Sequence, residues 1–193
     1  MANHVSNYIT MSCNNDACQK EWDKLFVSYG EEVERPSYHG DGTIKIWEWH
    51  EIQKHPFMSG YTDDNWYSWG IDNIGAKWAH IEDADDYHAY IVSAWSPVFG
   101  YLEKLYDHLV QFDSEVDIRC QYEDEFRNFI GVWQNTNYEE IEGDDLTSQF
   151  EEQYKVDLSS EDFDWSDVDK ETDTEYDQLF DDLVYNWFEE CQV

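Results

Sequence analysis

Basic side chains are scarce in this sequence. Only 11 of its 193 residues are Lys or Arg, against 45 Asp and Glu, so the formal net charge is −34. Duplex DNA carries one charge per roughly 1.7 Å of axis, so this is the charge of about 17 base pairs, or about 58 Å of duplex. A folded chain of this length is only about 40 Å across. Such a field opposes binding to nucleic acid or to an anionic membrane and attracts strongly basic proteins.

Long apolar runs and a cysteine framework are also lacking. The sequence has no run of 18 apolar residues, and its first residues, MANHVSNYITMSC, have neither the basic region nor the apolar stretch of a signal peptide. Its four cysteines are scattered along the chain, so we expect free thiols: Cys13, Cys18, Cys120 and Cys191. These absences predict a soluble protein of the cytoplasm with no membrane partner.

Aromatic residues, in contrast, are plentiful. They make up 18% of the chain, with 10 Trp, 14 Tyr and 10 Phe. Disordered chains with a high net charge are poor in these residues, so this chain is expected to fold. Its length suits one domain, or one domain with an appendage.

The first 133 residues alternate between strand and helix patterns. They predict a strand over 5–11, a helix over 17–29 that Asn14 or Asn15 caps and Gly30 ends, a loop over 31–42 and a short extended piece over 44–49. The chain is expected to change direction at Gly75. An extended segment over 77–81 and a strand over 87–94 then flank an acidic hairpin loop over 82–86. Pro97 opens a helix over 98–112, which is followed by strands over 116–122 and 129–133. The βαββαβ order predicts an α+β, ferredoxin-like sheet with its helices on one face.

Three short motifs carry a family resemblance. WYSW at 66–69, NIGAKW at 73–78 and AWSP at 94–97 resemble the YubB ferredoxin-like family of plasmid and phage proteins. The resemblance covers about residues 1–133. It implies a ferredoxin-like domain and a phage or plasmid origin, and it supplies no activity. We expect Trp69, Trp78 and Trp95 in the domain core, because a platform for stacking nucleic-acid bases would need a basic groove.

Residues 134–193 are the more acidic part of the chain. They contain 21 acidic and two basic side chains, a net charge of −19, against −15 for residues 1–133. Aromatic residues are interleaved with the acids. Tyr176, Phe180, Leu183, Val184 and Trp187 recur at helical spacing and predict an amphipathic helix over 174–190 that docks on the domain. The chain is therefore divided into a domain over 1–133 and an acidic, mainly helical extension over 134–193.

Two segments come close to metal-binding motifs. His50 and His55 lie in HEIQKH, but positions i and i+5 on a helix are about 140° apart, so the two imidazoles could not share a zinc ion, and we expect exposed loop histidines. Cys13 and Cys18 lack a second pair of ligands.

The second near-motif resembles a calcium-binding loop. Asp162, Asp164, Ser166 and Asp173 match ligand positions, but Asp167 replaces the required glycine and the last ligand is not a bidentate Glu. Weak, nonspecific divalent-cation binding is all that this pattern predicts. The sequence also lacks nucleophile-elbow and nucleotide-binding motifs, so no catalytic residue, metal site or cofactor is predicted.

The charge and the resemblance together predict a function. We expect a noncatalytic protein of a phage or mobile element that mimics the charge of DNA and binds, and so inhibits, a basic nucleic-acid-binding host protein such as a polymerase, nuclease, restriction or nucleoid protein. No direct contact with nucleic acid is expected. The expected contact residues lie in the tail: Asp162, Asp164, Asp167, Asp169, Glu171, Asp173, Asp177, Asp181, Asp182 and Glu189.

Two other classes of protein remain open. In one, the acidity is an adaptation to salt or a solubility device, and the protein binds divalent cations weakly without mimicking DNA. In the other, an enzyme or metal-dependent protein uses the tail carboxylates, although no motif supports it.

Overall fold

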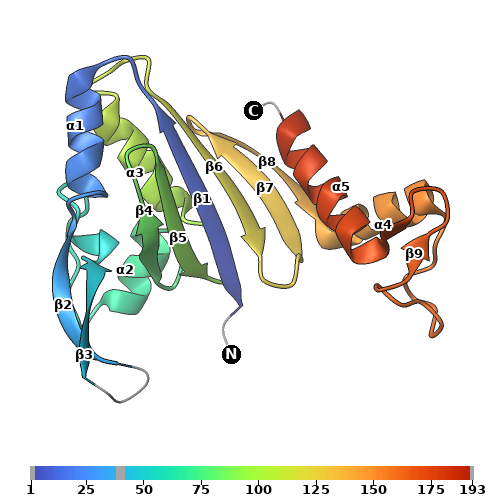
Figure 1. Ribbon diagram of the computed structural model, residues 1–193. Coiled ribbons are helices and arrows are strands. Elements are labelled where there is room, and N and C mark those ends of the chain that lie inside the picture. The colour runs from blue at the N-terminus through green and yellow to red at the C-terminus, as the bar shows by residue number, and fades with distance from the viewer. Residues whose placement is uncertain (1–2, 38–41, 192–193) are drawn as a thin grey trace.

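The chain folds as an α+β protein around a six-stranded antiparallel sheet with five helices (Figure 1). The computed structural model describes residues 3–37 and 42–191. The sheet order is β4-β5-β1-β6-β7-β8. These strands are β1 His4–Ser12, β4 Ala79–Ala84, β5 His88–Ala94, β6 Asp117–Asp124, β7 Phe129–Gln134 and β8 Asn137–Glu142.

The helices are α1 Asp16–Leu25, α2 Trp66–Asn73, α3 Phe99–Leu109, α4 Gly143–Tyr154 and α5 Tyr176–Glu190, with a 3₁₀ turn at Ile52–Lys54. Two small hairpins complete the fold: β2 Gly30–Pro36 with β3 Thr43–Trp49, and β9 Val168–Asp169 with β10 Thr174–Glu175. None of the helices in the described part of the chain is both long enough and apolar enough to cross a bilayer.

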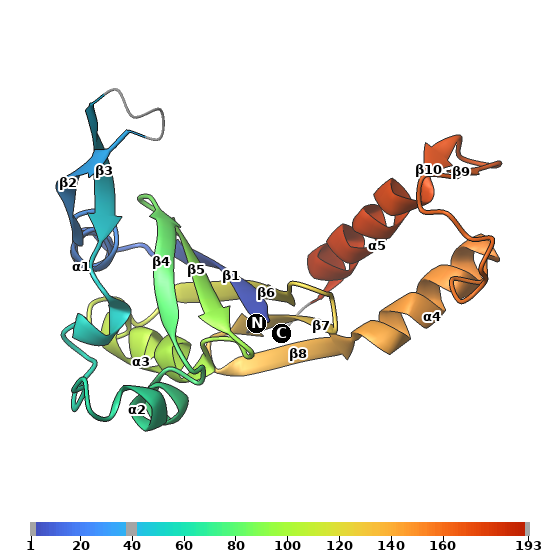
Figure 2. The same cartoon turned by 90° about the horizontal axis from the view of Figure 1, so that it is seen from below.

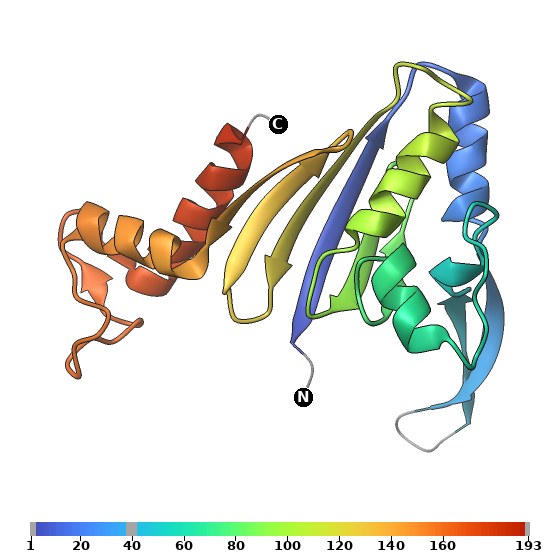
Figure 3. The ribbon, with the colours of Figure 1, turned by 180° about the vertical axis from the view of Figure 1, so that it is seen from behind.

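Helices α1, α2 and α3 cover one face of the sheet (Figure 3). Along β1 every second residue from Val5 to Met11 is buried, as the alternation of a half-covered strand requires. Beneath the helices lies the main core, which includes Trp22, Tyr101 and Leu105. Burying each such side chain stabilises the fold by about 1.5–3 kcal/mol.

Asn7 is a buried polar residue within this core. The two N–H groups of its Nδ2 have three acceptors within 3.0–3.1 Å, namely the Val5 and Ile91 carbonyls and Ser93 Oγ, and its Oδ1 accepts from the Val98 amide at 3.1 Å. Because both ends of the side-chain amide have hydrogen-bond partners, burying it leaves no polar atom unpaired. It fixes β1 against β5 and the start of α3.

Most predicted strands and helices are confirmed, with shifted ends. Asn15 caps α1 through a 2.8 Å hydrogen bond from the Ala17 amide, but the helix ends at Leu25 instead of continuing toward Gly30. Gly75 has a φ of +91°, which fits the predicted change of direction. The acidic hairpin loop is shorter than predicted, because β4 continues through a bulge to Ala84.

The predicted loop over 31–42 is wrong over much of its length. Residues 30–36 form β2 and pair with β3, while residues 38–41 of that prediction lie outside the described residues. Cross-strand ion pairs join Arg35 to Glu48 and Lys45 to Glu32. The β-propensity of a single segment does not indicate such pairs, because each one joins residues that are 13 apart in the sequence.

The three tryptophans expected in the core have different environments. Trp69 is buried and Trp78 is half-buried, but Trp95 is 48% exposed, so the prediction is wrong for Trp95. Trp95 follows the last residue of β5 and has a φ of +71°, which takes it out of the strand's alternation. Its ring lies 4.6 Å from the ammonium of Lys77 instead.

The two histidines of the zinc-like segment also differ. His50 is exposed, as predicted, but His55 is fully buried because the 3₁₀ turn brings it under α3. His55 Nδ1 lies 3.0 Å from the hydroxyl of Tyr101. The prediction of an exposed loop residue is therefore wrong for His55.

A second core lies outside the main one and joins α4, α5 and β7. It contains Ile130, Leu146, Phe150, Leu179, Phe180 and Val184. Helix α5 is close to the predicted helix over 174–190, and its apolar side forms part of this core. Strand β8 lies beyond residue 133 and pairs with β7, so the sheet runs across the predicted boundary between domain and extension.

Candidate interaction surface

Residues 143–191 form an acidic arm that contains all ten predicted contact residues. The arm consists of α4, the connecting segment with β9 and β10, and α5. It extends beyond β8, at the opposite end of the molecule from the β2–β3 hairpin (Figures 1 and 2). The structure therefore places the predicted contact residues together in one part of the molecule.

Four of these residues lie on α5 and are exposed: Asp177, Asp181, Asp182 and Glu189. Because a helix turns about 100° per residue, Asp177 and Asp181 lie on one flank, whereas Asp182 and Glu189 share another. The helix thus presents carboxylates on two sides of its solvent-exposed surface.

The other six belong to the segment before α5. Asp162, Asp167, Glu171 and Asp173 are exposed. Asp164 is also exposed, whereas Asp169 is buried, and both have local hydrogen-bond partners. Asp169 Oδ1 accepts hydrogen bonds from the Thr172 and Glu171 amides, both at 2.9 Å, and from the Thr172 hydroxyl, and these bonds lower the pKa of its carboxyl.

Asp164 has a similar local role. Its Oδ1 accepts from the Ser166 amide at 3.0 Å and from the Ser166 hydroxyl at 2.9 Å, which lowers the pKa of the carboxyl. Asp164 and Asp169 therefore shape turns. Among the described residues, no group of three or more His, Cys, Asp or Glu side chains is arranged to hold a metal ion.

Arg119 of β6 and Arg127 of the β6–β7 turn attach α5 to the domain, and no sequence pattern predicts either contact. Arg127 forms an ion pair with Asp181 at 2.5 Å, and its guanidinium lies 5.3 Å from the ring centre of Phe180. Arg119 donates to the carbonyl of Phe188 at 2.6 Å and to that of Cys191 at 3.3 Å. A cation at the carboxyl end of a helix also interacts favourably with the helix dipole. The only sequence signal was the rarity of basic residues.

Few carboxylates are neutralised by the chain's own bases. In the described part of the chain, five of the 11 Lys and Arg side chains form ion pairs with carboxylates. Arg119 and Lys104 instead donate to backbone carbonyls, and Lys77 lies among aromatic rings. Most of the 45 acidic side chains therefore contribute to an uncompensated negative field.

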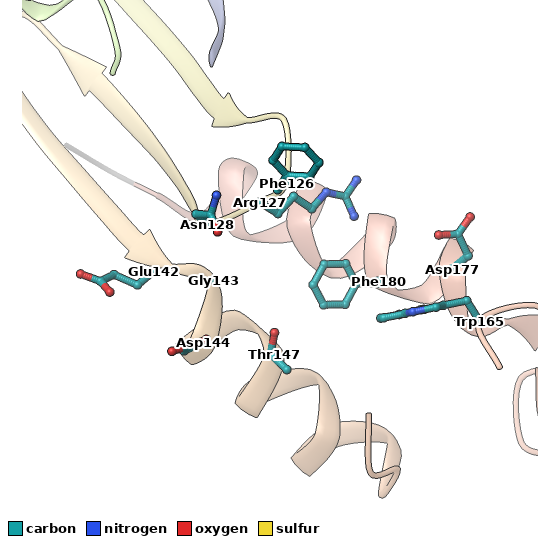
Figure 4. Close-up of a pocket in the computed structure, with 10 residues that line it drawn as sticks. All are labelled: Phe126, Arg127, Asn128, Glu142, Gly143, Asp144, Thr147, Trp165, Asp177 and Phe180. Carbon is teal, nitrogen blue, oxygen red and sulfur yellow. The ribbon is translucent and has the colours of Figure 1, made fainter. Parts of the chain in front are cut away.

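A cavity of about 550 Å³ lies where the arm joins the sheet (Figure 4). It lies between the β6–β7 turn, the start of α4 and the start of α5. Its lining residues are Phe126, Arg127, Asn128, Glu142, Gly143, Asp144, Thr147, Trp165, Asp177 and Phe180. In Figure 4, Trp165 points toward Phe180 from one side, while Glu142 and Asp144 point outward at the other. Aromatic rings thus line a cavity with carboxylates around its edge.

The β6–β7 turn that carries Phe126 is held by a buried carboxylate. Asp124 Oδ2 accepts from the amides of Phe126 at 3.1 Å and Asn128 at 3.3 Å, and from the Asn128 side chain. The Asn128 carbonyl in turn accepts from the Gly143 amide at 2.8 Å. Gly143 packs directly on the carbonyl of Arg127, which leaves no room for a side chain. These contacts fix the cavity's wall.

No described residue of the cavity or the arm belongs to a motif that identifies a reaction. Comparisons of the chain with protein-family models, with curated proteins and with solved structures found no match.

Proposed function

We propose that this is a noncatalytic acidic protein of a phage or mobile element that mimics the charge of DNA. It binds and inhibits a basic nucleic-acid-binding protein of the host, such as a polymerase, nuclease, restriction or nucleoid protein. The observation that carries the proposal is that the carboxylates of α5 are mounted on a helix whose apolar side is packed in a core. A fixed array of charges loses less conformational entropy on binding than a disordered acidic tail.

Charge complementarity supports this choice of partner. The negative field attracts a basic channel over long distances and increases the association rate, and its effect decreases with salt because the Debye length is about 8 Å at physiological ionic strength. The same field opposes direct binding of nucleic acid.

The elements around the main core support a ferredoxin-like assignment. β1, α1, β4, β5, α3 and β6 follow the βαββαβ order, with the β2–β3 hairpin and α2 inserted before β4. Their strands are neighbours in the order β4-β5-β1-β6, and α1 and α3 lie on one face (Figure 3). This assignment fits the resemblance to the YubB family, from which we infer the phage or plasmid origin.

The proposal is tested by capturing partners from host lysate on the immobilised full-length protein. We expect at least one captured protein that binds nucleic acid, is released by duplex DNA and by rising salt, and loses DNA binding when the acidic protein is added. The triple variant Asp177→Asn, Asp182→Asn, Glu189→Gln should bind this protein at least tenfold more weakly. Asp181 is left unchanged because its ion pair with Arg127 holds α5.

A matched triple variant provides the control. Glu31→Gln, Glu34→Gln and Asp63→Asn remove the same number of exposed charges far from the arm. This variant should bind the captured protein nearly as well as the wild type does. The proposal is wrong if the two triple variants bind equally, or if every captured protein lacks a nucleic-acid site.

A further inference from the structure

We propose that the cavity where the arm joins the sheet receives an arginine side chain of the basic partner. This inference rests on the proposed function and adds to it a specific contact. The cavity's volume of about 550 Å³ lies within the range of pockets that bind small ligands.

Two aromatic rings at the cavity are available to a ligand. Phe126 is 67% exposed and Trp165 is 40% exposed, although both line the cavity. Phe126 belongs to neither core, so packing of the fold does not use its ring. Aromatic faces attract cations, and a guanidinium also stacks on them through its planar surface.

One guanidinium of the chain, that of Arg127, already lies in the lining of this cavity. The Arg127 guanidinium lies 5.3 Å from the ring centre of Phe180 and pairs with Asp181 at 2.5 Å. A ring face and a carboxylate are thus combined around one arginine. A second ring and a second carboxylate, those of Trp165 and Asp177, also line the cavity, and the Asp177 amide donates to the Trp165 carbonyl at 3.1 Å.

Carboxylates around the cavity supply the charge for a second guanidinium. Glu142, Asp144 and Asp177 are exposed, and within the described residues none of them forms an ion pair with a basic side chain. The three negative charges exceed the single positive charge of Arg127, which Asp181 already pairs. The edge of the cavity therefore attracts cations rather than anions.

Arginine fits this cavity better than lysine. The guanidinium can stack on a ring while its N–H groups donate to carboxylates in its plane, whereas an ammonium is more strongly hydrated and has no flat face. A purely electrostatic surface would not distinguish two peptides of equal charge. Selectivity for arginine over lysine therefore distinguishes the cavity from the general acidic field.

The test uses two peptides of equal charge, acetylated tetra-arginine amide and acetylated tetra-lysine amide, titrated calorimetrically into the full-length protein at 0.15 M NaCl. The wild type should bind the arginine peptide roughly fivefold more tightly, as expected for one added ring contact. In Phe126→Ala and Asp177→Asn this preference should fall to near unity. Both side chains are exposed, so both variants should fold, which circular dichroism verifies.

Two variants on α5 serve as matched controls. Tyr185→Ala removes another exposed aromatic side chain, and Asp182→Asn removes another exposed carboxylate, and neither residue lines the cavity. Both should keep the preference for arginine.

Each outcome decides the inference. It is overturned if the wild type binds the two peptides equally, if Phe126→Ala and Asp177→Asn keep the preference, or if the control variants lose it. Equal binding of the two peptides is still compatible with the proposed function, because the acidic field of the protein attracts both peptides. If neither peptide binds, both this inference and the proposed attraction to basic proteins are wrong.

Discussion

Lowering the pH from 7.5 to 5.5 should destabilise the protein through His55. The imidazole is fully buried, with the Tyr29 ring centre at 4.3 Å and the Phe26 ring centre at 5.7 Å. Nδ1 lies 3.0 Å from the Tyr101 hydroxyl, and a backbone contact with Leu25 acts to raise the pKa of the imidazole, but burial outweighs this contact. Burial lowers the pKa of His55 from 6.5 to about 3, because a charged imidazole would be poorly solvated there.

The sign and size of the effect follow from proton linkage. Below pH 6.5 the unfolded chain binds a proton at residue 55 that the folded chain does not, so stability falls as the pH decreases toward the folded-state pKa of about 3. At pH 5.5, one unit below the unfolded pKa, this contribution is about 1.4 kcal/mol. Above pH 6.5 both states are neutral at this residue and the contribution disappears.

Urea denaturation at pH 7.5 and 5.5 measures this loss. Urea is uncharged, so it leaves the electrostatics of the acidic chain in place. Because other groups also titrate, the informative quantity is the difference between the wild type and His55→Gln, which cannot bind the proton but keeps a polar partner for Tyr101. The variant's stability should fall by about 1.4 kcal/mol less over this pH range.

The exposed His50 provides the control, since His50→Gln should retain the wild-type pH dependence. If His55→Gln has the same pH dependence as the wild type, the buried histidine is already protonated or accessible to water, and the predicted proton linkage is wrong.

Three further predictions concern stability. The melting temperature should rise from very low to moderate salt, because salt screens repulsion among exposed carboxylates; a flat or falling curve in a calorimetric salt series would contradict this. Asp181→Asn should lower the free energy of unfolding by about 0.2–1 kcal/mol through loss of its ion pair with Arg127, whereas Asp182→Asn should not lower it; equal urea midpoints for the two variants would argue against the pair. Gly143→Ala should destabilise by about 1–3 kcal/mol, because the added methyl group meets the Arg127 carbonyl; an unchanged urea midpoint would show that the turn can move freely.

The elements that could be predicted from sequence are those with a strong period of their own. β1 alternates buried and exposed residues, and the apolar stripe of α3 repeats at helical spacing, so both were found with small errors at their ends. The apolar side of α5 has the same helical spacing, although the predicted stripe does not include Leu179, which is buried on that side.

The errors concern residues whose environment depends on distant parts of the chain. β2 has no apolar alternation, and it pairs with β3 along its whole length, with two exposed ion pairs between the strands. His55 is buried because the chain folds back beneath Tyr101, and Trp95 is exposed because the backbone turns with positive φ.

The candidate site was predicted only in part. The acidic residues of the arm could be located by counting charges, but the sequence could not show that Arg127 and Asp181 form a pair. These two residues are 54 positions apart in the sequence. The cavity beside them depends on the same long-range packing, so no local pattern indicated it.

Strand β7 contributes buried residues to both cores. Ile130 packs against α4 and α5, while Trp133 on the same strand belongs to the main core. Few buried residues hold the arm, so it is the unit expected to open first in the native state, and its opening would expose one face of β7 while the other stays packed. A partner that binds the closed arm would suppress this opening. Amide hydrogen exchange in α4 and α5 would then slow on binding, with a smaller slowing in β7 and β8 and none in β1 or α3.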